Sequence, residues 1–265
     1  TVTLLHTMRI AFTKYQGTGN DFVMLDNLDG KFDSLSIDQI RFLCDRKLGI
    51  GADGLIKISS HDQFDFNVEY YNSDGSQSFC GNGARCSVAF AKSLGILESK
   101  TEFMAIDGTH KAEISVDGRV KLEMLPVNDI DRLGADYIMD TGSPHYIRFA
   151  TPDNVPEIVS LGKEIRYSDR FKDKGINVNT IIELGPETIH VATYERGVED
   201  ETLSCGTGVT ACALAYMLEH NSEEPVTVIT KGGKLSVKAK RNKDLFNEIW
   251  LTGPAKRVFD GSIDA

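Results

Sequence analysis

The sequence predicts an α+β fold of two pseudo-symmetric tandem domains, each with strands wrapped around one buried helix. Three observations lead to this prediction: short motifs recur in the same order in both halves, strand-like runs are punctuated by Asp-Gly and Gly-Gly turns, and two apolar helices each begin at a cysteine. A length of 265 residues allows one large domain or two of about half the chain. The repeat favours two.

Four motifs of the first half return in the second at offsets of 123, 126, 125 and 125 residues. The pairs are Thr18-Gly19-Asn20 with Thr141-Gly142-Ser143, Gly49–Ile56 with Gly175–Ile182, Cys80–Gly83 with Cys205–Gly208, and Gly108 with Gly233. Offsets this similar indicate two copies of one fold related by an approximate two-fold axis. We expect domains at residues 8–128 and 129–255, with residues 256–265 packing back on the first; residues 1–7, before Met8, are left out.

The predicted strands are rich in β-branched and aromatic residues. They include Phe22–Leu25, Phe66–Tyr71, Thr188–Tyr194 and Leu235–Ala239. Between the first two, the run Ser36–Gln39 forms a capping box that predicts a helix with an apolar face. That face comprises Ile37, Ile40, Leu43 and Cys44.

Two further helices are expected at Gly81 to about Leu94 and at Gly206 to about Glu219. Both are dense in small and apolar residues nearly all round, a pattern typical of a buried central helix. Each follows a cysteine directly. We therefore expect each domain to enclose a helix that starts at a thiol.

A cysteine at the first turn of a helix faces unpaired backbone N–H groups and the positive end of the helix dipole, which favours the thiolate. Glycines beside the two cysteines are expected to let a ligand carboxylate approach those N–H groups; they are Gly81, Gly83, Gly206 and Gly208. Two such sites brought together would set a thiolate and a thiol on opposite faces of one carbon. This predicts racemisation or epimerisation with Cys80 and Cys205 as acid and base and with no pyridoxal cofactor.

The other three cysteines lack the Gly-x-Gly context and are interpreted as inert core residues: Cys44, Cys86 and Cys212. Five cysteines without a CxxC pair predict reduced thiols and no metal site. Gly49-x-Gly51-x-x-Gly54 matches the dinucleotide-binding pattern formally, but it follows a predicted helix and leads into a strand. Because the dinucleotide-binding motif requires a strand followed by a helix, we exclude a dinucleotide-binding site here.

Several polar residues could bind an amino acid. Arg196 suits a carboxylate and Glu195 an ammonium group, although such neighbours are as often a solvated ion pair. His145 could tune a thiolate or deprotonate a thiol, and the alternative is a structural histidine. Asn20, Asn72 and Asn177 are turn residues by default.

The composition limits the partners. A net charge of -10 and a pI near 5.1 have the wrong sign for nucleic acid. No window approaches 18 consecutive apolar residues, and the N-terminus lacks a signal pattern, so we expect no membrane partner and a cytoplasmic protein.

These motifs together resemble the diaminopimelate epimerase family, the cofactor-independent enzymes of lysine and peptidoglycan precursor synthesis. The resemblance runs nearly end to end, through Lys14–Phe22, Asn72–Ser76, Cys80–Cys86, Gly142–His145, Asn177-Val178, Tyr194–Gly197 and Cys205–Gly208.

The resemblance implies two domains, each a mixed sheet or open barrel around a central helix, and an active site between them. It implies that Cys80 and Cys205 exchange acid and base roles on LL-2,6-diaminopimelate, converted reversibly to the meso form. It further implies backbone donors at Gly81-Asn82 and Gly206-Thr207, and tuning of the cysteines by His145 and Glu195. The groups implied to hold the substrate's amino and carboxylate ends are Asn20, Asn72, Asn177, Glu195 and Arg196. A homodimer with a contact near Phe259 is also implied.

Two positions depart from the family pattern, since many members carry Asn at Ser143 and some carry Gln at Gly54. Either change would remove a side-chain contact to substrate. The alternatives are therefore a related racemase or epimerase for another amino acid, or a non-catalytic binding protein in which Cys80 and Cys205 form a switchable disulfide.

Overall fold

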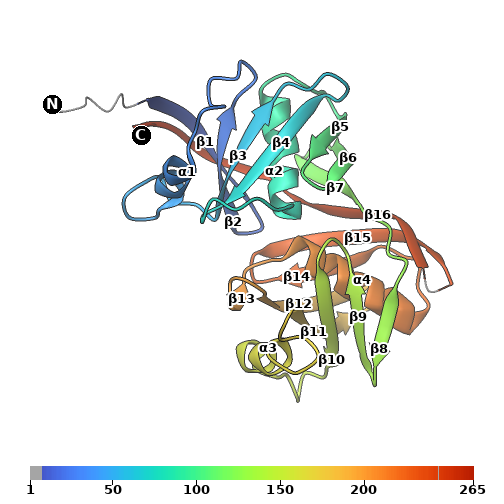
Figure 1. The fold of residues 1–265 in the computed structure, drawn as a ribbon. Coiled ribbons are helices and arrows are strands. Elements are labelled where there is room, and N and C mark those ends of the chain that lie inside the picture. Colours follow the sequence, from blue (N-terminus) through green and yellow to red (C-terminus); the bar gives the residue numbers. More distant parts are fainter. Residues whose placement is uncertain (1–7, 244) are drawn as a thin grey trace. The chain divides into compact units, whose positions relative to one another are not determined.

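The computed structural model describes residues 8–243 and 245–265. The chain divides into two units (Figure 1). The first unit comprises the residues up to Val120 together with Ala255–Ala265, and the second comprises Lys121–Pro254. Residues 121–128, which the sequence prediction assigns to the first domain, group with the second unit. The backbone of Val127 exchanges two hydrogen bonds with Phe246, each 2.9 Å, which holds this segment to the second unit.

The first unit is a mixed sheet in the order β17-β1-β2-β3-β4-β5-β6. Strands β17 and β1 pair antiparallel, as do β1 and β2, β3 and β4, and β5 and β6, whereas β2–β3 and β4–β5 are parallel. The bounds are β1 Arg9–Gly17, β2 Asn20–Asp26, α1 Ile37–Cys44, β3 Gly54–Ser59, β4 Phe66–Asn72, α2 Gly81–Ser93, β5 Lys100–Ala105, β6 Gly108–Ile114 and β17 Lys256–Asp264.

The second unit repeats this pattern in the order β8-β9-β10-β11-β12-β14-β15-β16, again with two parallel pairs, β10–β11 and β12–β14. Its elements are β7 Arg119–Met124, which starts in the first unit, β8 Ile130–Leu133, β9 Asp136–Asp140, β10 Pro144–Ala150, α3 Ile158–Arg166, β11 Asn177–Gly185, β12 Thr188–Glu195, β13 Asp200–Thr202, α4 Gly206–His220, β14 Val226–Thr230, β15 Gly233–Asn242 and β16 Leu245–Pro254. Each unit has a hairpin, a helical crossover, a second hairpin and a second helical crossover. The predicted α+β tandem fold is confirmed.

Helices α2 and α4 are the buried helices of their units. In α4 every residue from Gly206 to Met217 is buried except Thr207. The helix packs against strands β9 to β12 and β14 to β16, and Figure 1 shows it among them. Both helices end within one residue of the predicted positions. The C-cap of α4 is Asn221, which has a φ of +50°, a left-handed conformation that asparagine tolerates. This confirms the expectation of strands around an enclosed helix.

Helix α1 begins at the predicted capping box. Gln39 N–H donates to Ser36 Oγ at 3.2 Å, and Ser36 N–H donates to Gln39 Oε1 at 3.0 Å. The predicted apolar face is correct for Ile40, Leu43 and Cys44 but wrong for Ile37, which is 52% exposed. Ile37 lies in the first turn and covers the turn at Gly75, where an added Cβ would sit 2.4 Å from its Cγ2.

The described helices include none that is both long and apolar enough to cross a membrane. Within the same residues, no group of three or more His, Cys, Asp or Glu side chains is arranged to hold a metal ion.

Candidate active site

Cys80 and Cys205 are the N-cap residues of α2 and α4. Their backbones are extended, with φ of -131° and -110°, and the next residue of each is helical. The first-turn N–H groups therefore point toward the space beside each sulfur. The prediction that both buried helices begin at a cysteine is confirmed, and the two half-sites are described in turn.

In the first unit, Cys80 Sγ contacts both a donor and an acceptor. Gly83 N–H donates to the sulfur at 3.4 Å, and Asn20 Oδ1 lies 3.5 Å from it. Asn20 follows the β1–β2 turn, where Thr18 and Gly19 adopt positive φ values of 53° and 86°. The sulfur can thus donate as a thiol or accept as a thiolate.

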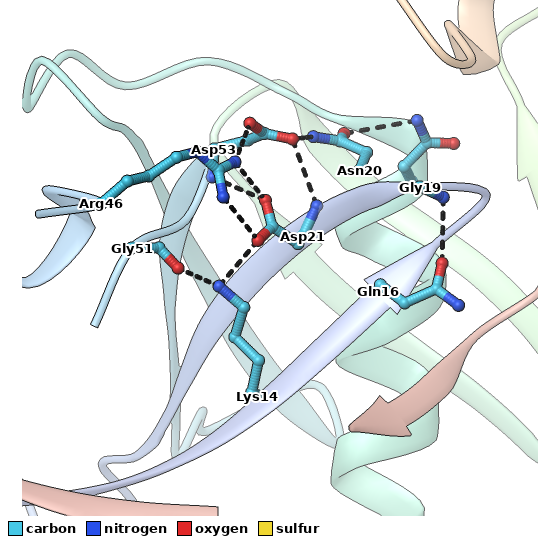
Figure 2. Close-up of polar contacts among 9 residues, drawn as sticks. Lys14, Gln16, Gly19, Asn20, Asp21, Arg46, Gly51 and Asp53 are labelled. Atoms are coloured by element: carbon cyan, nitrogen blue, oxygen red, sulfur yellow. Dashed lines mark hydrogen bonds and ion pairs between the residues drawn. The ribbon is translucent and has the colours of Figure 1, made fainter. Parts of the chain in front are cut away.

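An ionic network orients the Asn20 amide (Figure 2). Asn20 Nδ2 donates to Asp53 Oδ2 at 2.6 Å, so its oxygen faces Cys80. Arg46 bridges Asp53 and Asp21 at 2.7 Å each, and Lys14 lies 2.8 Å from Asp21. Burial opposes ionisation of Asp21, but hydrogen bonds from Arg46 and Lys14 lower its pKa to about 2. Asp53, for which the sequence pattern predicted no role, thereby connects a charged cluster to the site.

A buried arginine supports the first turn of α2. Arg85 is fully buried and donates to Asn82 Oδ1 at 2.8 Å and to the Gly81 carbonyl at 3.2 Å. Asn82 Nδ2 in turn donates to Asn20 Oδ1 at 3.3 Å. Burial lowers the pKa of Arg85 to about 10, so the group stays charged at neutral pH, and it forms no ion pair within the described residues. A lone arginine in an apolar helix was the sequence signal for this role.

Asn72 ends β4 and binds its own turn. Its Nδ2 donates to Ser76 Oγ at 3.0 Å and to Ser78 Oγ at 3.3 Å, which holds the segment that leads to Cys80. Gly54 pairs with Asn72 across the sheet. An added Cβ at Gly54 would lie 2.4 Å from the Tyr70 ring, so Tyr70 fills the space that a larger side chain would need.

In the second unit, the Thr207 hydroxyl contacts three polar side chains. Its Oγ1 lies 3.3 Å from Cys205 Sγ, 2.9 Å from His145 Nε2 and 3.0 Å from Ser143 Oγ. Asn177 Nδ2 donates to Ser143 Oγ at 3.1 Å. Ser143, at a position of departure from the family pattern, is thus joined to Cys205 through one hydroxyl.

His145 is completely buried on β10. Its Nδ1 lies 3.0 Å from Nδ2 of Asn179, a residue for which the sequence pattern predicted no role. Complete burial, the largest effect, lowers the pKa of His145 to about 3. An imidazole this difficult to protonate is poorly suited to take a proton from a thiol. The geometry favours tuning through hydrogen bonds.

Glu195 and Arg196 lie at the end of β12, beside Asn177. The Arg196 backbone N–H donates to Asn177 Oδ1 at 2.8 Å, and its guanidinium donates to the Lys174 carbonyl at 2.9 Å. Arg196 is exposed, so its guanidinium is accessible to a carboxylate, and Glu195 is half-buried.

The second glycine of each Cys-Gly-x-Gly motif has a structural explanation that differs from the expectation. An added Cβ at Gly83 would contact Ile56 at 3.1 Å, and one at Gly208 would meet Asn179 Oδ1 at 2.6 Å. Both positions therefore face the sheet of their own unit. The missing side chain at Gly83 and Gly208 permits close packing of each helix on its sheet, and the expected role of these glycines in ligand approach stays a prediction.

The remaining expectations concern separate places. Cys44, Cys86 and Cys212 are free and buried, and burial raises the pKa of each thiol, to about 12 for the first two, as expected of core residues. The Gly49–Gly54 segment runs from a helix into a strand, as predicted. Phe259, on β17, is 47% exposed. Its ring packs edge-to-face with that of Phe12, with 5.9 Å between the ring centroids.

Comparison with solved structures defines the class of fold. The chain is similar to a phenazine biosynthesis protein of the PhzF family from Bacillus anthracis, with a TM-score of 0.73 and 14% identity over 97% of this chain and 99% of that one. It is also similar to a hydroxyproline epimerase from Agrobacterium vitis, with a TM-score of 0.68 and 14% identity over 97% and 92% of the two chains. At this identity the likeness shows a shared fold.

Sequence comparison defines the family. Residues 12–129 and 137–258 match the family described as diaminopimelate epimerase. A diaminopimelate epimerase from Flavobacterium psychrophilum is 45% identical over 94% of this chain and 98% of its own length. One from Aquifex aeolicus is 39% identical over 95% and 97%. The chain belongs to the diaminopimelate epimerase family.

Proposed function

We propose that the chain is an isomerase that converts LL-2,6-diaminopimelate reversibly to the meso isomer by a two-base reaction of Cys80 and Cys205, in the biosynthesis of lysine and peptidoglycan precursors. The observation that carries this proposal is the repeated helix start, in which each unit offers one cysteine as the N-cap of its buried helix. The family membership supports the substrate.

In the proposed reaction the two half-sites act on opposite faces of one α-carbon. The thiolate removes the α-proton, the electron pair passes into the carboxylate, and the thiol on the other side delivers its proton to the carbon. The configuration inverts and the cysteines exchange protonation states. Backbone N–H groups at Gly81-Asn82 and Gly206-Thr207 stabilise the dianion that forms in between.

The remaining polar groups bind the substrate rather than react. Arg196 pairs with a carboxylate and Glu195 with an ammonium group, and Glu195 also tunes the cysteines together with His145. Three asparagines complete the set: Asn20, Asn72 and Asn177. The present contacts of Asn20 and Asn177 support this role, because each has its amide orientation fixed by a partner, Asp53 or the Arg196 N–H.

The proposal includes three properties of the whole protein. The reaction uses no cofactor, because the thiols supply both proton-transfer steps and the helix ends supply the charge stabilisation. The enzyme acts as a homodimer, and the exposed face of β17 around Phe259 supports an interface there. It works in the cytoplasm, where its free thiols stay reduced.

Replacing each cysteine separately tests the proposal. Positioned acid–base catalysis is worth roughly 10² to 10⁴-fold per group, so Cys80→Ala and Cys205→Ala should each lose at least that much epimerisation. Cys212→Ala, which removes a buried thiol from the same helix as Cys205, is the matched control. Turnover near the control value in either single variant would contradict the proposal.

A further inference from the structure

We propose that Asn179 is a positioning residue that holds neutral His145 with its proton on Nε2, so that a chain of hydrogen bonds through Thr207 delivers a donor to Cys205. This inference rests on the proposed function for its catalytic meaning. Its structural content, the position of one proton, stands on the geometry of the second unit alone.

The first step is the orientation of the Asn179 amide. Asn179 Nδ2 lies 3.0 Å from the Tyr146 carbonyl oxygen, which only accepts, so this atom must be the nitrogen. On the other side, Thr193 Oγ1 donates to Asn179 Oδ1 at 2.9 Å. Reversing the amide would set two acceptors against each other beside Tyr146. The orientation is therefore fixed from both ends.

The second step is the tautomer of His145. The amide nitrogen that donates to Tyr146 has a second hydrogen, and His145 Nδ1 lies 3.0 Å from that nitrogen. Because Asn179 donates, Nδ1 must accept and carries no proton. A neutral imidazole then carries its proton on Nε2. Complete burial and the lowered pKa of His145 keep the ring neutral.

The third step is the direction of the bonds at Thr207. His145 Nε2–H lies between two hydroxyl oxygens, Thr207 Oγ1 at 2.9 Å and Ser143 Oγ at 3.0 Å, and donates to both. Because Ser143 Oγ accepts from this N–H and from Asn177 Nδ2, its own hydrogen is directed to Thr207 Oγ1 at 3.0 Å. With both lone pairs of its hydroxyl engaged, Thr207 directs its hydrogen to Cys205 Sγ at 3.3 Å. The sulfur is an acceptor in this arrangement, which favours the thiolate.

The packing around Asn179 shows a site built for this contact. Asn179 and His145 are each completely buried, and Thr193 is 3% exposed. Gly208 brings the first turn of α4 against them, with an added Cβ 2.6 Å from Asn179 Oδ1 and 3.2 Å from His145 Cε1. A side chain at residue 208 would separate the helix that carries Cys205 and Thr207 from the groups that orient it.

The test is nitrogen NMR of uniformly ¹⁵N-labelled full-length protein, with the His145 ring assigned by comparison with His145→Gln. We expect Nδ1 to give the signal of an unprotonated ring nitrogen and Nε2 that of a protonated one from pH 6 to pH 8. A protonated Nδ1 in the native protein would overturn the inference. This readout needs no substrate, so it remains decisive even if the proposed reaction fails.

Variants connect the proton position to catalysis. Asn179→Asp offers only acceptors, so we expect the proton to move to Nδ1, the Thr207 hydroxyl to turn to Nε2, and kcat to fall about tenfold to 100-fold, the effect of one lost hydrogen bond to a charged group. The KM should change less, because Asn179 is placed behind His145. Unchanged kcat with the proton moved to Nδ1 would overturn the inference.

Two further variants separate positioning from packing. Thr207→Ser keeps the hydroxyl and should retain most of kcat, whereas Thr207→Val should lose as much as Asn179→Asp. Thr210→Val is the matched control, because it removes another buried hydroxyl of α4. The Thr210 hydroxyl donates to the Gly206 carbonyl at 2.9 Å and takes no part in the hydrogen bonds that lead to Cys205. Equal kcat losses in Thr207→Val and Thr210→Val would contradict a directed donor at Cys205.

Discussion

We expect replacement of Gly208 by alanine to destabilise the protein and to impair catalysis beyond the loss of stability. In a helix interior, alanine is favoured over glycine by about 1 kcal/mol. Here the added methyl would lie 2.6 Å from Asn179 Oδ1 and 3.3 Å from Thr193 Oγ1. Overpacking of a buried site typically costs about 1 to 3 kcal/mol, and Asn179 cannot yield easily because its amide is bonded at both ends. The net result should be a loss of up to about 2 kcal/mol.

The matched variant is Gly83→Ala at the equivalent position of α2. Its added methyl would meet Ile56 Cδ1 at 3.1 Å, the end of a flexible side chain that can move by a few tenths of an ångström. We expect its stability to be unchanged or raised by up to about 1 kcal/mol. Urea unfolding followed by circular dichroism compares the two variants, and kcat is measured on the folded fraction. A Gly208→Ala protein as stable and active as the native one would refute the packing argument.

Three more outcomes follow from the charged and buried groups. Asp53→Asn weakens the anchor of the Asn20 amide, so kcat should fall roughly tenfold, whereas Asp62→Asn, on an exposed loop, should match the native enzyme. The pKa of His145 is about 3 in the folded protein and about 6.5 in the unfolded chain, so below pH 6.5 the unfolded chain binds a proton that the folded protein does not. The free energy of unfolding should therefore fall by about 1.4 kcal/mol for each pH unit below 6.5. In urea unfolding at pH 6 and pH 4, His145→Gln should lose correspondingly less stability than the native protein, and equal losses would contradict the burial of His145 as a neutral group. Iodoacetamide at pH 8 should alkylate Cys80 and Cys205 before the other cysteines, as followed by mass spectrometry. Early alkylation of the buried thiols of Cys44, Cys86 and Cys212 would be inconsistent with their raised pKa values.

Local signals made much of the fold predictable. The motif offsets near 125 residues indicated a repeat, and the strand pairings of the two units repeat in the same order because each motif marks the same turn or helix start. The capping box at Ser36 and the two cysteine N-caps were predictable for the same reason. The one misplaced core residue, Ile37, lies in the first turn of α1, where periodicity alone cannot tell the core from a covered turn.

The supporting residues of the site were not predictable in this way. Asp53 binds Asn20 across 33 positions, and Asn179 binds His145 across 34. Such contacts depend on which strands become neighbours, as in the parallel pairing of β10 and β11 that sets His145 opposite Asn177. Arg85 lies in a helix that the sequence predicts to be buried, but its contacts with Asn82 and the Gly81 carbonyl depend on how the first turn of that helix folds.

The most direct test of the two-base account is the fate of the α-proton in D₂O. Reduced protein is mixed with LL-2,6-diaminopimelate without added cofactor, and proton NMR follows both isomers early in the reaction. The account predicts that the meso product carries deuterium at the inverted carbon, because the second thiol delivers a solvent-exchanged proton, while the remaining substrate keeps its protium. Product that retains the original proton would indicate a single base that carries it across, and would contradict the paired roles of Cys80 and Cys205.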